Sequence, residues 1–220
     1  NKLRQRYSVG YYHGGLASDQ RKTLQQQFSQ NKLKLLVATN AFGMGINKED
    51  IRFVIHYDLP DSLENYSQEI GRAGRDGKQS SAILLYQEHD EQIHYFFQRE
   101  NKEERRALER MDQEKMKGPL TPLQEKWQLK MKELGAAFWL ETLKQNEQQK
   151  QEQLQKMLAY IHFTGCRRQF LLAHFGEDAP ANPYCCDNDG IELAAEEELL
   201  EKKVILHWQE RLIKIFKDIN

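Results

Sequence analysis

Three short apolar runs in the first half of the chain constrain its fold more than any other feature. They cover residues 34–39, 52–57 and 81–86, and each is short and rich in aliphatic side chains. Runs of this length are typical of buried parallel strands. Helical patterns fill the intervals between the runs, at residues 18–29 and 62–72. The alternation predicts an α/β layer fold with a parallel sheet.

The composition changes after about residue 92. Gln, Glu and Lys then dominate, strand signals vanish, and Gly118-Pro119 and Pro122 are the main interruptions, so we expect helices that break at these prolines. The tail from Glu192 predicts one amphipathic helix that packs on the rest of the protein, with partner binding as the alternative. Its apolar face would comprise Ile205, Trp208, Leu212, Phe216 and Ile219.

Charge and cysteine content narrow the class of protein. The 32 basic and 33 acidic residues give a net charge of −1, which neither favours nor excludes nucleic acid. No apolar run is long enough for a membrane span, so we expect no membrane partner. The start lacks both Met and a signal sequence, which indicates a processed or truncated beginning. The three cysteines lie in one stretch, as in a reduced chain with a local metal site.

The sharpest motif is QEIGRAGRDG at residues 68–77. On a continuous helix Gln68, Arg72 and Arg75 would share one face, with Gly71 and Gly74 beside the arginines. Glycine is unfavourable in a helix, so two of them indicate close approach of another surface. Guanidinium groups match phosphate oxygens, and the motif therefore favours a polyphosphate site. Surface salt bridges are the alternative.

Two further Gly-bearing segments lie upstream of this motif. The apolar run that ends at Thr39 passes into a glycine-bearing loop at residues 40–47, where ligands of open α/β sheets bind. His13 lies in an earlier Gly-bearing turn, and Arg21 lies on the helix that follows. A structural hydrogen bond is the alternative role for His13.

Taken together, these segments resemble the late motifs of superfamily 2 helicases. The segments YHGGL, VATNAFGMGINKEDIRFVIHYDLP and SLENYSQEIGRAGRDG occur in the family's order and in the form of the RecQ helicases. DEAD-box RNA helicases would have ARGID and HRIGRTGR at the corresponding places. A second segment, GCRRQFLLAHFGE at residues 165–177, resembles the start of the RecQ zinc-binding subdomain.

The resemblance implies an organisation and a fold. It divides the chain into a second RecA-like helicase lobe over 1–99, truncated at its N-terminus, a helical connecting region over 100–160, a small zinc-binding subdomain over 161–190 and a C-terminal amphipathic helix over 191–220. The family has a strand and a helix before YHGGL, and we expect these to be missing.

The resemblance also implies roles for single residues. Arg75 would be an arginine finger facing ATP and Mg²⁺ on another lobe, Arg72 a second γ-phosphate contact, and Gln68 a coupling residue. Residues near the nucleotide would be Gly45 and Asn47, and those on the DNA would be Thr39, His13 and Arg21.

The metal site is where the chain departs from the family. Cys166, Cys185 and Cys186 match three of its four cysteines, but the fourth position is Asp189. Carboxylate oxygen can bind zinc, so a Cys₃Asp site for Zn²⁺ is expected, although structural sites mostly use Cys and His. His174 is a less favoured substitute ligand, and a decayed site packed by apolar residues is the alternative.

The whole pattern predicts part of an ATP-dependent 3′-to-5′ DNA helicase active in repair and recombination. Neither GxxxxGK[ST] nor a DEAH-like motif occurs in the sequence, so we expect its partner to be the N-terminal, ATP-binding lobe of the same parent chain, and this fragment alone to be inactive. The substrate would be single-stranded DNA or duplex with a 3′ tail, in bacterial cytoplasm at the nucleoid. The alternative is a non-catalytic DNA-binding or docking module.

Overall fold

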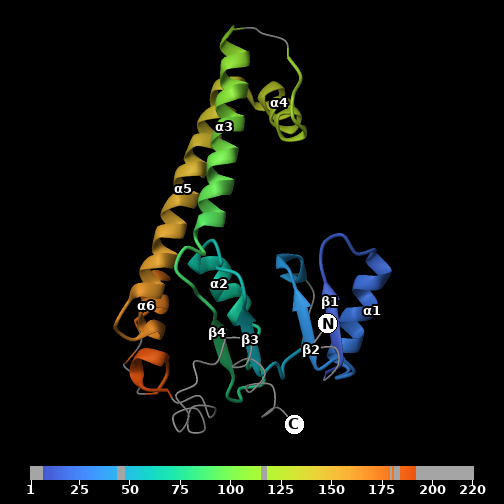
Figure 1. Ribbon diagram of the computed structural model, residues 1–220, viewed down its shortest axis with the longest axis vertical. Helices are drawn as coiled ribbons and strands as arrows, with labels where there is room; N and C mark the ends of the chain where they lie inside the picture. Colours follow the sequence, from blue (N-terminus) through green and yellow to red (C-terminus); the bar gives the residue numbers. More distant parts are fainter. Residues whose placement is uncertain (1–6, 44–47, 115–117, 179, 181–183, 192–220) are drawn as a thin grey trace. The chain divides into compact units, whose positions relative to one another are not determined.

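The computed structural model describes residues 7–43, 48–114, 118–178, 180 and 184–191 (Figure 1). The chain forms two compact units, Asn1–Leu154 and Gln155–Asn220. Within the described ranges, no helix has the length and apolar character that a membrane span requires. The C-terminal helix expected over 191–220 lies, except for Ile191, outside the described residues.

The first strand pair of the larger unit is β1 (Val9–Tyr12) with β2 (Leu35–Ala38), joined by helix α1 (Ser18–Ser29). The strands are parallel, and their register aligns Val9 with Leu35 and Tyr12 with Ala38. The sequence analysis did not anticipate β1, because Gly10 interrupts it. A Cβ at Gly10 would lie 2.8 Å from Leu33 Cδ1 and 2.9 Å from Leu36 Cδ1, so glycine leaves room there for these leucine side chains.

The second strand pair is β3 (Phe53–His56) with β4 (Ser81–Leu84), again parallel and joined by helix α2 (Leu63–Ile70). The α/β alternation and the parallel pairing are confirmed. In the described residues the four strands form two pairs rather than one continuous sheet. In each pair, one helix connects the two strands. Residues 44–47, between the two pairs in sequence, are not among those described.

The Gln- and Lys-rich region consists of helices, as expected. They are α3 (Gln92–Glu114), α4 (Pro122–Leu134) and α5 (Ala136–His162). Helix α4 begins where the prolines predicted a break: Thr121 Oγ1 accepts from the backbone N–H of Gln124 at 3.2 Å, and Pro122 stands in the first turn.

A small hydrophobic core holds these three helices together. Its members are Leu108, Met131 and Leu140, with Leu120, Trp127, Ala136 and Trp139 packed against them.

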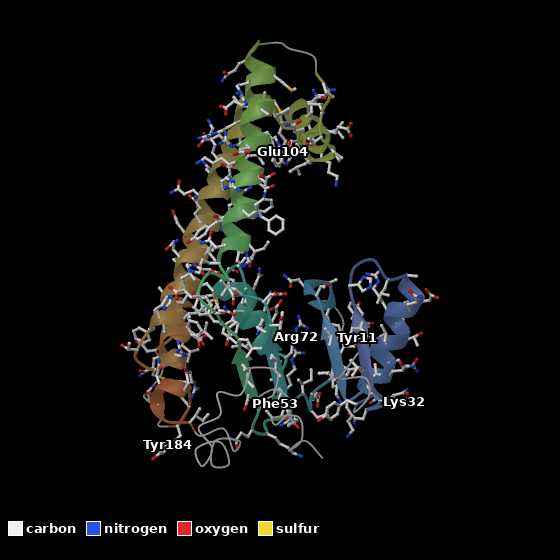
Figure 2. The ribbon with its side chains drawn as sticks, viewed as in Figure 1. Tyr11, Lys32, Phe53, Arg72, Glu104 and Tyr184 are labelled. Carbon is white, nitrogen blue, oxygen red and sulfur yellow. The ribbon has the colours of Figure 1, made fainter. Side chains whose placement is uncertain are left out.

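Polar contacts fix the register of the same helices. Arg105 is only 5% exposed, and its guanidinium binds Glu147 through two hydrogen bonds of 2.7 and 3.2 Å and Glu109 through one of 2.9 Å. Thr121 donates to Glu104 on α3 at 2.9 Å (Figure 2). A buried arginine that lost these carboxylates would be strongly destabilising, so the pairing specifies how α3 and α5 align.

The smaller unit contains the last turns of α5, helix α6 (Arg167–His174) and the 3₁₀ turn η3 (Asp187–Asp189). Aromatic rings join α5 to α6: the centroid of Phe170 lies 5.8 Å from that of Tyr160 and 5.0 Å from that of Phe163. Among the described residues of this unit, the buried hydrophobic side chains are Met157, Tyr160 and Cys166.

Candidate nucleotide-facing turn and metal centre

The arginine motif forms a turn after helix α2 and not a continuation of it. Ser62 caps the start of α2, but the helix ends at Ile70, and Gly74 has a φ of +67°. A Cβ at Gly74 would lie 2.5 Å from Ser80 Oγ and 3.0 Å from Lys78 O, so glycine is required by both conformation and space. The expected helical face shared by Gln68, Arg72 and Arg75 is therefore wrong, since the helix ends at Ile70, before both arginines.

The turn is held by contacts with the segment that precedes β3. The backbone N–H of Gly74 donates to Ile51 O at 2.9 Å. Arg52 binds Asp76 Oδ1 at 2.5 Å and donates to Gln79 O at 2.9 Å. The hydrogen bond from Arg52 lowers the pKa of Asp76, so this carboxylate stays charged to a lower pH than an ordinary aspartate does. Sequence reasoning missed Arg52, because nothing in a strand pattern shows which distant carboxylate it meets.

The two motif arginines differ in their surroundings. Arg72 is half-buried, directly beyond α2 (Figure 2). Arg75 is exposed, and its Nε donates to Gly71 O at 3.1 Å. Within the described residues, no carboxylate lies within 4.0 Å of the Arg75 guanidinium. Gln68 is exposed near the end of α2. Gly45 and Asn47, expected near the nucleotide, lie outside the described residues.

The structure brings His13 and Thr39 to adjacent loops at the carboxyl ends of β1 and β2. The backbone N–H of Thr39 donates to Tyr12 O at 3.0 Å, and both His13 and Thr39 are exposed. The loop after β2 is anchored by Phe42, whose ring packs edge-on against Tyr12 at 5.0 Å. Arg21 is half-buried in α1, and no contact joins it to His13 or Thr39 among the described residues.

The four expected metal ligands converge in the smaller unit. Cys166 stands at the N-cap of α6, while the other three lie in the 184–190 segment, and all four ligand atoms lie within 4.8 Å of one another. Cys166 Sγ is 3.3 Å from Cys185 Sγ, and Asp189 Oδ2 is 3.2 Å from Cys185 Sγ and 3.0 Å from Cys186 Sγ. A tetrahedral zinc would separate such ligands by about 3.6–3.8 Å. The donor set therefore fits Zn²⁺ after small side-chain shifts.

Protonation of this cluster follows from its burial. Burial raises the pKa of the Cys185 thiol to about 12 and also raises that of Cys186. Hydrogen bonds, first of all from Cys186, lower the pKa of Asp189. The metal-free cluster thus has protonated thiols that donate to a carboxylate, and these thiols must lose their protons when they bind a metal.

Two residues that sequence reasoning did not single out hold the loop that carries the ligands. The Arg167 guanidinium binds both oxygens of Asp187, at 2.5 and 2.9 Å, and donates to Tyr160 O at 2.8 Å. Asn188 donates to Phe163 O and to Gly165 O, both at 2.8 Å. The only sequence signal for them was their position beside the cysteines. His174 is not in the ligand cluster within the described residues; its ring packs against Phe175.

Comparisons with known proteins agree with this geometry. Residues 1–77 match the model of the helicase conserved C-terminal domain, and residues 124–189 match that of the RecQ zinc-binding region. ATP-dependent DNA helicase RecQ of Bacillus subtilis is 33% identical over 205 residues, which cover 92% of this chain. The chain belongs to the RecQ helicase family. Probable ATP-dependent DNA helicase RecS of the same organism is 34% identical over 237 residues, covering 94% of the chain.

This RecQ-family chain spans only part of its relatives. It covers 28% of the length of the B. subtilis RecQ protein and 46% of that of RecS. A solved DEAD box protein from Methanococcus jannaschii is 34% identical, with a TM-score of 0.38 over 44% of this chain and 27% of the other. Residues 78–123 lie between the two regions that the family models match.

Proposed function

We propose that this chain supplies the second motor lobe and the zinc module of an ATP-dependent DNA helicase, with Arg75 as its arginine finger. The observation that carries the proposal is the turn at residues 71–77. The turn is fixed from both sides by Gly74 and Asp76, yet the Arg75 guanidinium is exposed and has no described carboxylate partner. The family match and the names of the relatives support the helicase assignment.

A rigid turn that carries an uncompensated arginine is suited to stabilising a transition state. Charge develops on the γ-phosphoryl oxygens during transfer, and a preorganised guanidinium meets that charge without reorganisation. The turn orders the backbone of Arg75, while its side chain stays accessible. In the proposal Arg72 makes a second phosphate contact and Gln68 couples nucleotide binding to lobe closure. ATP with Mg²⁺ would be held mainly by an N-terminal lobe that carries the phosphate loop.

We assign the loops after β1 and β2 to the DNA track. His13 and Thr39 are exposed on adjacent loops, where a hydroxyl, an imidazole and backbone N–H groups can contact a DNA backbone. Arg21, in the first turns of α1, is proposed as a further DNA contact. We propose that the helicase moves in the 3′-to-5′ direction and that its substrate is single-stranded DNA or a duplex with a 3′ tail.

The zinc module is proposed to be structural. Cys166, Cys185, Cys186 and Asp189 would hold Zn²⁺, which would link the start of α6 to the 184–190 segment. Arg167 and Asn188 orient the ligand loop independently of the metal.

The test is Arg75→Ala in a protein that contains both helicase lobes. We expect ATP turnover to fall about 10³-fold or more while nucleotide affinity stays nearly unchanged, because the finger acts in the transition state. Arg75→Lys should restore little, because an ammonium lacks the planar fork. Lys78→Ala, an exposed cation in the same segment, is the matched control and should leave turnover intact.

Two outcomes would oppose the proposal. Near-normal kcat in Arg75→Ala would make this arginine structural. No DNA-stimulated ATP turnover in the two-lobed protein, with DNA binding retained, would favour the docking module instead.

A further inference from the structure

Helix α3 carries a straight stripe of exposed side chains along its outer face. The residues follow one another at spacings of three and four, which places them in one row. All of them are exposed, whereas Arg105 and Leu108, on the opposite side of the helix, are buried. We call this row the α3 stripe; it comprises Phe96, Arg99, Glu103, Arg106, Arg110 and Gln113.

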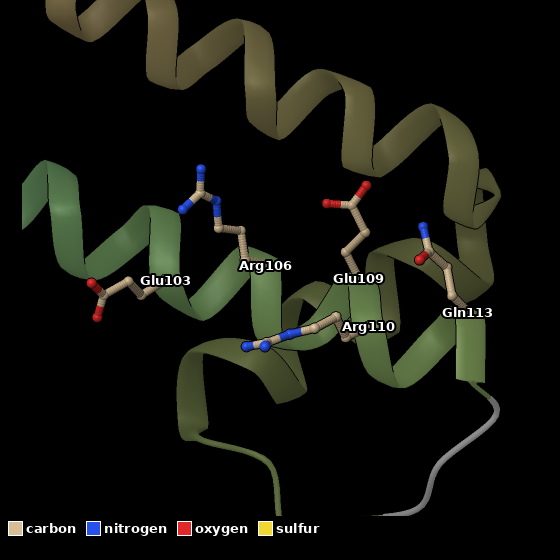
Figure 3. Close-up of a pocket in the computed structure, with 5 residues that line it drawn as sticks. All are labelled: Glu103, Arg106, Glu109, Arg110 and Gln113. Atoms are coloured by element: carbon tan, nitrogen blue, oxygen red, sulfur yellow. The ribbon is translucent and has the colours of Figure 1, made fainter.

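An open groove of about 580 Å³ runs along the distal half of the stripe. It is lined by Glu103, Arg106, Glu109, Arg110 and Gln113, all from α3 (Figure 3). Figure 3 shows Arg106 and Arg110 on α3, with Glu103, Glu109 and Gln113 beside them. The charged side chains that line the groove are thus two arginines and two glutamates.

The stripe arginines differ from Arg105 in their partners. Arg105 is ion-paired with Glu109 and Glu147, whereas Arg99, Arg106 and Arg110 have no carboxylate within 4.0 Å among the described residues. Glu109 is itself engaged by Arg105 and by Lys144 at 3.3 Å.

The stripe therefore has a net positive charge. Glu103 is its one acidic residue. Three uncompensated arginines in a row along a rigid helix favour an anionic ligand.

We propose that the α3 stripe binds the sugar-phosphate backbone of a single-stranded nucleic acid. Arg99 and Arg110 are separated by about 16 Å along the helix axis, and Arg106 and Arg110 by about 6 Å. A small anion cannot reach all three, but a polyanion with closely spaced phosphates can.

An aromatic ring at the base of the stripe favours a single strand over an acidic peptide. Phe96 is 45% exposed, and the Arg99 guanidinium lies 5.7 Å from its ring centroid. An exposed aromatic beside a basic row is a stacking platform for unpaired bases. A peptide of acidic residues alone would use the charges but has no ring to stack on Phe96.

The surface lies outside the motor motifs. Helix α3 falls within residues 78–123, between the two family matches, and the core around Leu108 fixes it against α4 and α5. Binding there needs no nucleotide turnover, so it is separable from the proposed role of Arg75.

The test measures oligonucleotide affinity of the whole 220-residue chain by fluorescence anisotropy, without ATP. The triple variant Arg99→Gln/Arg106→Gln/Arg110→Gln should weaken binding of a single strand about 10-fold or more at moderate salt. It should also reduce the slope of log K against log salt by about 2, since each phosphate contact on a single strand contributes about 0.7.

The matched control removes the same charge from exposed positions on α4, through Lys126→Gln/Lys130→Gln/Lys132→Gln. It should change neither affinity nor salt slope by more than a small fraction. Glu103→Gln should tighten binding, because it removes the one acid in the stripe. Both triple variants alter exposed side chains, so their thermal unfolding should match that of the parent chain.

The aromatic contribution is tested separately. Phe96→Ala should weaken single-strand binding by about 5-fold or more, because stacking on one base is worth about 1–3 kcal/mol. Phe138→Ala, which removes an exposed ring from α5, should have little effect.

Three results would overturn the inference. The first is no binding of single strands by the parent chain. The second is equal affinity and salt slope for the α3 and α4 triple variants. The third is binding of a polyglutamate peptide through the stripe arginines without binding of DNA, which would assign an acidic protein partner. None of these bears on Arg75, because no ATP is turned over in the assay.

Discussion

The metal centre offers the most direct test of how sequence and structure combine in this chain, through the exchange Asp189→Cys. Asp189 Oδ2 lies 3.2 Å from Cys185 Sγ and 3.0 Å from Cys186 Sγ. A zinc ion would separate a carboxylate oxygen from a sulfur by about 3.6 Å, so the ligands need to move apart by only about half an ångström. A fourth thiolate at this position should bind zinc better than the carboxylate does, because soft sulfur ligands suit zinc.

The size of the effect follows from the number of ligands. Structural zinc binds with about 10–16 kcal/mol at neutral pH, or about 2.5–4 kcal/mol per ligand when shared among four. Cys166→Ser should therefore lower zinc affinity about 10²–10³-fold, since 1.4 kcal/mol corresponds to about tenfold. Asp189→Cys exchanges one ligand for a better one, and its gain should be smaller, about tenfold.

The assay is competition for zinc with a chromophoric chelator, combined with thermal unfolding before and after EDTA. The smaller unit should loosen on chelation before the α/β strand pairs do. Glu177→Cys adds a thiol at an exposed position outside the ligand cluster and should leave zinc affinity unchanged. The reasoning is refuted if protein purified without chelator contains almost no zinc and EDTA leaves its unfolding unchanged; the site would then have decayed.

Three further expectations concern stability and activity. In a urea titration, Gly74→Ala should lower the free energy of unfolding by about 2 kcal/mol or more, because the left-handed conformation costs about 1–2 kcal/mol and the added Cβ meets Ser80. Gly77→Ala is the control: Gly77 has a φ of +75° but open space around it, so this variant should lose less stability. The hydrogen bond from Arg167 lowers the pKa of Asp187 in the folded chain. The Arg167–Asp187 pair therefore stabilises the fold fully above the ordinary pKa range of a carboxyl group, and this contribution is lost as the pH falls through the lowered pKa. Wild type should therefore exceed Asp187→Asn in stability at neutral pH and converge with it in acid, as followed by thermal unfolding. The 220-residue chain should show no ATP hydrolysis above background, since it contains no GxxxxGK[ST] segment, and DNA-stimulated turnover by the purified chain would contradict this.

Local sequence determined the elements whose signals are local. The apolar runs at 34–39, 52–57 and 81–86 became β2, β3 and β4, and residues 18–29 became α1 with the expected limits. The prolines after Gly118 predicted the start of α4, because proline favours the first turn of a helix. The identities of the four cluster residues, Asp189 included, also followed from sequence, through the family resemblance.

Tertiary structure decided the features that depend on residues far apart in the chain. The turn that follows the end of helix α2 at Ile70 is fixed by the hydrogen bond from the Gly74 N–H to Ile51 O, and no periodicity in the motif itself could show that contact. The pairing of Arg52 with Asp76 joins positions on either side of α2. Strand β1 pairs with β2 although it contains Gly10, and the missing Cβ leaves room for the side chains of Leu33 and Leu36.

The same division holds for the two candidate binding surfaces. The spacing of Arg72 and Arg75 could be read from sequence, but which of them is exposed and without a described carboxylate partner depended on how the turn folds. Arg105 and Arg106 are neighbours in a charge-rich run that sequence treats alike. Packing of α3 against α5 buries the first beside Glu147 and leaves the second exposed, because a helix turns adjacent side chains to different faces and only the fold says which face is covered.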